Sequence, residues 1–337
     1  MTEFARDISA RNVLQRLGIT DYLNRDGVTE VMINRPKEVF LEGSFGVQRI
    51  EDERLTLSHL SQLANVLSIF NNKHLTVKEP MHSVTLPNGE RGHIVMPPAC
   101  EDGTLVFAFR KPSTHRFSLE DYVVTQRLPT QVQTTKNTLT QLAPYEQAML
   151  AHKTISNWTD FFRLAVEYRL NICMVGGTGS GKTTFTKAIA DLIPPSTRLI
   201  TIEDTHELDL PRHPNRVHLF YKEHITAKAV IASCLRLKPD RIFLTELRGD
   251  EAWDYLSALN TGHPGGLTSV HANDAESAFY RIAQLAKESE TGQTMDYEYL
   301  LNTVRATIDI VCFFEKTHMT ELYFDPVAKR QAMRNRR

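Results

Sequence analysis

The chain has 337 residues, 41% of them hydrophobic, and a formal net charge of −1 at pH 7. This length suggests about two domains, and this hydrophobic fraction is sufficient for ordinary cores. A net charge so close to zero creates no global attraction to nucleic acid or acidic membranes, so direct nucleic-acid binding is unsupported.

The chain carries no pattern for crossing or leaving a membrane. No apolar stretch approaches the roughly 18 residues of a spanning helix, and the N-terminus lacks the basic and apolar regions of a signal peptide. We therefore expect a cytoplasmic protein. Its cysteines, Cys100, Cys173, Cys234 and Cys312, lie far apart, which argues against a zinc knuckle or a disulfide framework and predicts core residues.

Residues 1–115 are predicted to form an α+β N-terminal domain. Apolar spacing predicts a helix over 10–22, strands at 30–34 and 38–42, and a second helix over 57–70. Three further strands, at 83–86, 91–96 and 104–110, favour an antiparallel sheet.

Residues 116–145 are predicted to be a linker, because the chain becomes polar there and Thr and Gln crowd into 130–136. A linker of this length is compatible with domain swapping between neighbouring subunits and equally with a surface meander.

Residues 146–337 are predicted to form a parallel α/β sheet. Helical patterns alternate with apolar runs at 170–175, 199–202, 217–221, 242–244, 267–270 and 308–314. The basic C-terminal end, 329–337, allows peripheral contact with acidic lipid, although a disordered solubilising tail is the favoured interpretation.

A complete phosphate loop lies between the 170–175 strand and an amphipathic helix. Its glycines let backbone N–H groups surround phosphate, Lys182 reaches the β- and γ-phosphates, and Thr183 is suited to ligate Mg²⁺. The helix N-terminus adds partial positive charge. The predicted nucleotide-binding residues are Gly176, Gly177, Thr178, Gly179, Ser180, Gly181, Lys182, Thr183 and Thr184.

Polar residues follow three of the predicted strands. Glu203 and Glu246 come where strands end, and the carboxyl ends of parallel strands line the ligand crevice of an open α/β sheet. Hydrolysis needs a carboxylate that holds metal or orients water. His271 ends a third strand, where it is suited to sense the γ-phosphate or bond a catalytic carboxylate; a lone histidine is more often structural.

The ordered motifs resemble those of the secretion ATPase superfamily and, within it, the type IV secretion traffic ATPases. The C-terminal resemblance rests on the phosphate loop and on 201–208, 241–249 and 261–272. The N-terminal resemblance rests on 33–36, 86–91, 95–98 and 109–112, so it covers most of the chain.

This resemblance implies a hexameric ring of two-domain subunits with a RecA-like C-terminal domain. ATP would bind between the domains, and Mg²⁺-dependent hydrolysis would power type IV secretion, conjugative pilus assembly and substrate transfer. The ring would lie in the cytoplasm, peripheral to the inner membrane, with other type IV secretion components as partners.

The resemblance also implies roles for individual residues. Glu203 and Glu207 would lie in the acidic box, Glu246 would be the Walker B carboxylate, and His271 would end the histidine box. We favour Glu246 for activating water, with Glu203 assisting water or, with Thr183, the metal. By the same matching, two arginines of the N-terminal domain would reach the nucleotide, namely Arg91 and Arg110.

The sequence departs from the family pattern at Thr245, where glycine is common, which we interpret as a tuning change. Related machines remain alternatives. Type II secretion relatives usually carry a four-cysteine zinc insertion that these dispersed cysteines cannot supply, and the C-terminal signature of pilus-retraction relatives is not found. A phosphate-loop phosphotransferase would have no use for the histidine box. A non-hydrolysing scaffold would need disabled acids, whereas Glu203 and Glu246 are intact.

Overall fold

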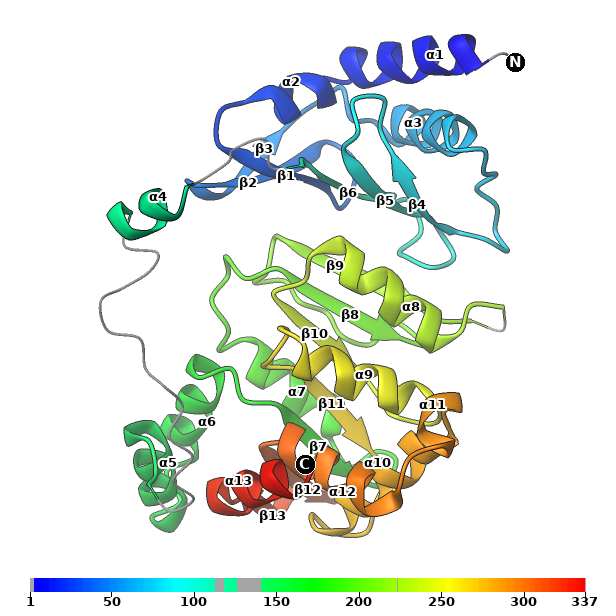
Figure 1. The fold of residues 1–337 in the computed structure, drawn as a ribbon. Coiled ribbons are helices and arrows are strands. Elements are labelled where there is room, and N and C mark those ends of the chain that lie inside the picture. Colours follow the sequence, from blue (N-terminus) through cyan, green and yellow to red (C-terminus); the bar gives the residue numbers. More distant parts are fainter. Residues whose placement is uncertain (1–2, 113–117, 126–140, 223, 337) are drawn as a thin grey trace.

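The computed structural model describes residues 3–112, 118–125, 141–222 and 224–336. Two sheets carry the fold, one in each half of the chain, and Figure 1 shows the N-terminal sheet above the C-terminal one. Most of the predicted linker lies outside the described residues, apart from the short helix α4 (Leu119–Val124) and the segment leading into the C-terminal half. The α+β and α/β classes predicted for the two halves are confirmed.

The N-terminal half is a six-stranded antiparallel sheet with three helices on one face. Strand order is β3-β2-β1-β6-β5-β4. The elements are α1 (Glu3–Arg16), α2 (Ile19–Asn24), β1 (Val28–Ile33), β2 (Glu38–Gly43), β3 (Gly46–Glu51), α3 (Leu57–Phe70), β4 (Met81–Thr85), β5 (Arg91–Val95) and β6 (Val106–Arg110). Alternate strand residues, such as Val31 and Phe107, pack under the helices, while Met32 and Ala108 point to the opposite face.

Two N-terminal details differ from prediction. The single helix predicted over 10–22 is two helices, because Gly18 has a φ of 72° and interrupts the helical path. Strand β3 was not predicted, since it lies at the sheet edge with mostly exposed residues and therefore lacks an apolar alternation.

The C-terminal half is a seven-stranded sheet in the order β13-β12-β7-β11-β10-β8-β9. Its strands are β7 (Ile172–Gly176), β8 (Leu199–Glu203), β9 (Arg216–Phe220), β10 (Arg241–Leu244), β11 (Leu267–Val270), β12 (Ile310–Glu315) and β13 (His318–Phe324). The parallel strands are the predicted ones, whereas the antiparallel edge strand β13 was not predicted.

Helices cover both faces of this sheet, so the C-terminal half has three layers. Residues of α8 (Ala227–Cys234), α9 (Glu251–Asn260), α10 (Ser277–Glu288) and α12 (Tyr297–Thr307) share one core with the sheet. The opposite face packs against α5 (Pro144–Thr154), α6 (Trp158–Glu167) and α7 (Lys182–Ala190). The short helices η1 (Leu235–Leu237) and α11 (Glu290–Gln293) join these elements. All four cysteines are buried and free, as predicted.

The C-terminal end is helical, so the favoured prediction of a disordered tail is wrong. Helix α13 (Pro326–Asn335) begins with Asp325 as its N-cap. Lys329 pairs with Asp309 and Arg330 pairs with Glu146, which fixes the helix against the C-terminal half. Within the part of the chain that the structure describes, no helix is long and apolar enough to cross a bilayer.

The second face of the N-terminal sheet packs on β8, β9 and α8. The carbonyl of Ala99 accepts a hydrogen bond from the Phe220 N–H at 2.9 Å. At another point, the buried Arg198 guanidinium donates to Asn34 Oδ1 at 2.9 Å. Burial lowers the pKa of Arg198 to about 10. The two halves therefore share one buried, hydrogen-bonded interface.

We expect His93 to make this interface sensitive to acid. Its Nε2 lies 2.6 Å from Ser233 Oγ across the interface. Burial, with smaller effects of Arg236, Lys73 and His82, lowers the pKa of His93 from 6.5 to about 3. The unfolded chain therefore binds a proton more readily than the folded chain between these pKa values. The contribution of neutral His93 is complete above its unfolded pKa and is lost as pH falls toward the folded pKa.

We expect wild-type protein to lose about 2 kcal/mol more unfolding free energy between pH 7 and pH 5 than His93→Gln. Glutamine keeps a polar group near Ser233 but does not titrate. Denaturant unfolding at the two pH values measures both losses, and equal losses in the two proteins would contradict this assignment.

Candidate nucleotide site

The phosphate loop connects the carboxyl end of β7 to the first turn of α7. Gly176, Gly179 and Gly181 have backbone φ values of 141°, 74° and 92°, which residues with a side chain rarely adopt. A Cβ on Gly176 would also lie 2.3 Å from the Phe314 carbonyl oxygen. The glycines are therefore required by the path of the loop itself.

Lys182 points back across this loop. Its Nζ donates to the carbonyls of Gly176 and Gly177 at 2.8 and 2.9 Å. Burial lowers the pKa of Lys182, and the carboxylates of Glu246 and Glu207 oppose that effect. The ammonium group is thus held at the mouth of the loop with negative charge nearby.

The loop fits a phosphate chain. A Cβ built on Gly177 or Gly179 meets nothing within 4 Å, so the loop is open on that side. Residues 177–180 line a cavity of about 550 Å³ together with Ala272, Asn273 and 313–316. Among the described residues, the buried Ser180 Oγ has no hydrogen-bond partner. An open, N–H-rich loop before a helix suits an anion.

The structure brings Glu207, rather than Glu203, to the predicted metal ligand Thr183. Thr183 Oγ1 donates to Glu207 Oε2 at 3.0 Å. Glu203 is fully buried, and its Oε2 accepts the N–H groups of Glu207 and Leu208 at 2.8 and 2.9 Å. Burial alone would raise the pKa of Glu203, but hydrogen bonds from His218, these two N–H groups and Thr201 keep it below its ordinary value. Glu203 is therefore ionised and fixes the segment that carries Glu207.

Glu246 is held between a histidine and an arginine. Its Oε1 lies 3.1 Å from His271 Nε2, and its Oε2 accepts a bond from Arg248 Nη2 at 2.8 Å. Arg248 also pairs with Asp204. The sequence predicted Glu246 and His271 at strand ends but did not single out Arg248 and Asp204. The available signal was their position beside Glu246 and Glu203 in the two strand-end segments.

Thr245 is accommodated within the sheet. Its Oγ1 donates to the Ile202 carbonyl at 3.3 Å, and its own carbonyl accepts a bond from Ser269 Oγ at 2.7 Å. The hydroxyl is thus used between neighbouring strands, which explains how the structure accommodates this side chain.

Arg91 and Arg110 lie together but away from this loop. They are direct register partners on β5 and β6. They line a cavity of about 580 Å³ that also contains Lys238. Lys238 precedes β10, whereas the phosphate loop follows β7. The cavity therefore lies at the amino ends of the parallel strands, and the loop lies at their carboxyl ends. One chain alone does not bring these arginines to its own phosphate loop.

Known proteins resemble this chain over most of its length. A family model described as "Type II/IV secretion system protein" matches residues 17–312. The chain belongs to the type II/IV secretion system protein family. Within this family, the type IV secretion system protein VirB11 of Brucella suis is 40% identical over 324 residues, covering 92% of this chain and 89% of the relative. The VirB11 protein of Bartonella henselae is 36% identical over 329 residues, covering 93% and 92%.

A solved structure supports the same membership. The crystal structure of the VirB11 ATPase from the Brucella suis type IV secretion system, in complex with sulphate, superposes with a TM-score of 0.92 at 38% identity and covers 98% of each chain. The resemblance to type IV secretion traffic ATPases, first based on motifs, is thereby confirmed across both halves of the chain.

Proposed function

We propose that this chain is a Mg²⁺-dependent ATPase that works as a hexameric ring and powers type IV secretion or conjugative pilus assembly and substrate transfer. ATP hydrolysis for type IV secretion follows from the family and from its VirB11 relatives. The enzymatic proposal rests on the position of Glu246. His271 and Arg248 hold this carboxylate at the carboxyl ends of the parallel strands, where the phosphate loop also lies. A type II secretion or pilus motor is not better supported.

Each residue of the site has a separate proposed role. Lys182 binds β- and γ-phosphate oxygens, and Thr183 with the adjacent Glu207 holds the metal. Mg²⁺, when bound, neutralises charge on the phosphates. Glu246 orients the attacking water and accepts its proton, while His271 positions Glu246. We propose that Glu203, first predicted as a metal ligand or water-assisting acid, acts by fixing the segment that carries Glu207.

Arg91 and Arg110 are proposed to complete the nucleotide site of a neighbouring chain. Like charges directly opposite one another destabilise a sheet, yet these two side chains form such a pair on β5 and β6. A pair of guanidinium groups is well suited to spread phosphate charge. These arginines lie at the amino ends of the parallel strands, whereas the phosphate loop of the same chain lies at the carboxyl ends. Contact with a second copy would therefore bring the arginines of one chain to the phosphate loop of the other. Ring assembly would then be a requirement for full activity.

The proposed setting is the cytoplasmic side of the inner membrane, among other type IV secretion components. Basic residues of α13 would make only a small contribution to lipid contact, because Lys329 and Arg330 already form ion pairs.

Replacing Glu246 with glutamine tests the proposal. We expect steady-state phosphate release to fall by about 100- to 10,000-fold, because the amide cannot accept the proton of water. ATP should still bind, since Lys182 and Thr183 are unchanged. Light scattering in ATP should give the mass of a hexamer.

Glu298→Gln, an exposed acid on α12, is the matched control and should keep wild-type turnover. Wild-type turnover in Glu246→Gln would contradict the assigned role, and a monomer mass under every nucleotide condition would contradict the ring. Transfer of phosphate to an added small-molecule acceptor, instead of water, would favour the phosphotransferase alternative.

A further inference from the structure

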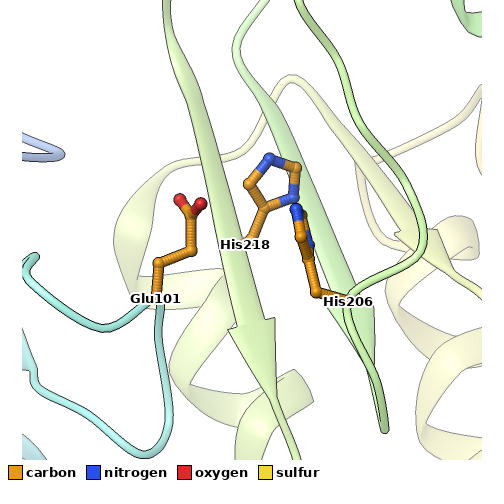
Figure 2. A group of neighbouring side chains, drawn as sticks. All are labelled: Glu101, His206 and His218. Atoms are coloured by element: carbon orange, nitrogen blue, oxygen red, sulfur yellow. The ribbon is translucent and has the colours of Figure 1, made fainter.

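Three metal-ligating side chains converge beside the acidic segment. Glu101, His206 and His218 each offer one ligand atom, and these atoms lie within 4.8 Å of one another. Figure 2 shows the three side chains next to one another, with His218 between Glu101 and His206 in this view. Apart from the hydrogen bond from His218 to Glu203, the nucleotide site described above does not use these three groups.

The three residues come from separate parts of the fold. Glu101 lies in the loop between β5 and β6 of the N-terminal half, His206 follows β8, and His218 lies on β9. The loop is fastened close by, through the bond between the Ala99 carbonyl and the Phe220 N–H. The cluster therefore spans the interface between the two halves.

A buried carboxylate orients both histidines. Glu203 Oε1 lies 3.5 Å from the Nδ1 atoms of His206 and His218. Thr201 Oγ1 lies 2.8 Å from His218 Nδ1. Histidines that bind metals commonly engage a carboxylate or another polar group through the second ring nitrogen. These contacts engage the Nδ1 atoms of both histidines.

The donor set selects the class of ion. Two imidazoles and one carboxylate suit Zn²⁺ and similar transition metals, whereas Mg²⁺ and Ca²⁺ prefer oxygen ligands. Metal–nitrogen bonds of about 2.0–2.1 Å hold the ligand atoms of one ion close together, and a cluster within 4.8 Å reaches that geometry through small side-chain movements. His206 is exposed and Glu101 is partly exposed, both outside regular strands, while buried His218 provides a fixed point.

We propose that Glu101, His206 and His218 form a binding site for Zn²⁺ or a similar transition-metal ion. The ion fastens the N-terminal half to the acidic segment of the ATPase half. Because Glu203 holds both histidines and also the backbone of Glu207, the ion restrains the segment next to the phosphate loop. This site is separate from the proposed Mg²⁺ site and goes beyond the proposed function.

Co²⁺ titration of the full-length, tag-free protein tests this site. We expect one strongly bound Co²⁺ per chain, with the visible absorption bands of an ion that has nitrogen and oxygen ligands. Added Zn²⁺ should displace Co²⁺ and abolish these bands. His206→Gln and Glu101→Gln should each weaken binding by about 100-fold or more, since loss of an outer-shell partner alone costs about 10- to 100-fold. His224→Gln, an exposed histidine on a nearby segment, should bind as wild type does.

Thermal unfolding supplies a second readout. Zn²⁺ should raise the melting temperature of wild-type protein and of His224→Gln but not that of Glu101→Gln. Absence of bands, or unchanged binding in His206→Gln and Glu101→Gln, would overturn the proposal. Bands that disappear in Thr183→Ala but persist in His206→Gln would place the ion at the phosphate loop and equally overturn it.

Discussion

Replacing Lys182 with alanine is expected to reduce ATP turnover by at least about 100-fold, the usual effect of losing one preorganised donor to transition-state charge. The substitution removes the ammonium group that the structure holds at the loop mouth, 2.8 and 2.9 Å from the carbonyls of Gly176 and Gly177. Steady-state phosphate release measures the loss, and it should be measured with membranes and partner proteins as well as alone.

Lys187→Ala is the matched control, since Lys187 lies on the same helix but beyond the phosphate loop. It should retain wild-type turnover and thermal stability. Turnover in Lys182→Ala within a few-fold of that control would show that the loop is not the hydrolytic site.

Removing Arg110 or Arg91 is expected to lower turnover by about 1,000-fold or more, the range known for arginines that stabilise phosphoryl-transfer charge. ATP binding to the phosphate loop should change much less, because neither side chain lies near the loop of its own chain. Phosphate release and nucleotide binding are measured on the same preparations, with the exposed Arg163 on α6 replaced by alanine as a control.

Loss of Arg110 should leave the fold intact. Its Nε lies 3.4 Å from Glu30 Oε1, so the substitution removes a partner from a buried carboxyl group. Burial raises the pKa of Glu30 to about 7, so this group takes up a proton near neutral pH at little cost. A melting temperature near that of wild type, together with lost turnover, is the expected result; a large drop in melting temperature would assign Arg110 a structural role.

The sequence was most informative about buried parallel strands. The runs at 170–175 and 267–270 form strands that are buried on both faces, because helices cover both sides of the sheet. The corresponding strands β7 and β11 were predicted closely. Edge strands β3 and β13 face solvent along much of their length, so they carry no such run. The end of α1 depends on one left-handed glycine, Gly18, which the helical apolar spacing obscured.

The candidate site was predictable at the level of strand ends but not of contacts. Glu246 and His271 follow neighbouring parallel strands, so topology brings them together. The choice of Glu207 over Glu203 as the neighbour of Thr183 depends on how the segment after β8 turns, which no local pattern encodes. The predicted domain limits of 1–115, 116–145 and 146–337 stay predictions; the N-terminal sheet ends at Arg110 and α5 begins at Pro144.

The central claim is that neighbouring chains share each nucleotide site. The most direct test mixes equal amounts of two inactive proteins, Lys182→Ala and Arg110→Ala, under conditions that allow chains to exchange, and then measures phosphate release. A site with an intact loop from one variant and intact arginines from the other recovers activity, and random assortment in a ring predicts about a quarter of the wild-type rate. A mixture that stays at the sum of the two inactive proteins would contradict the shared site.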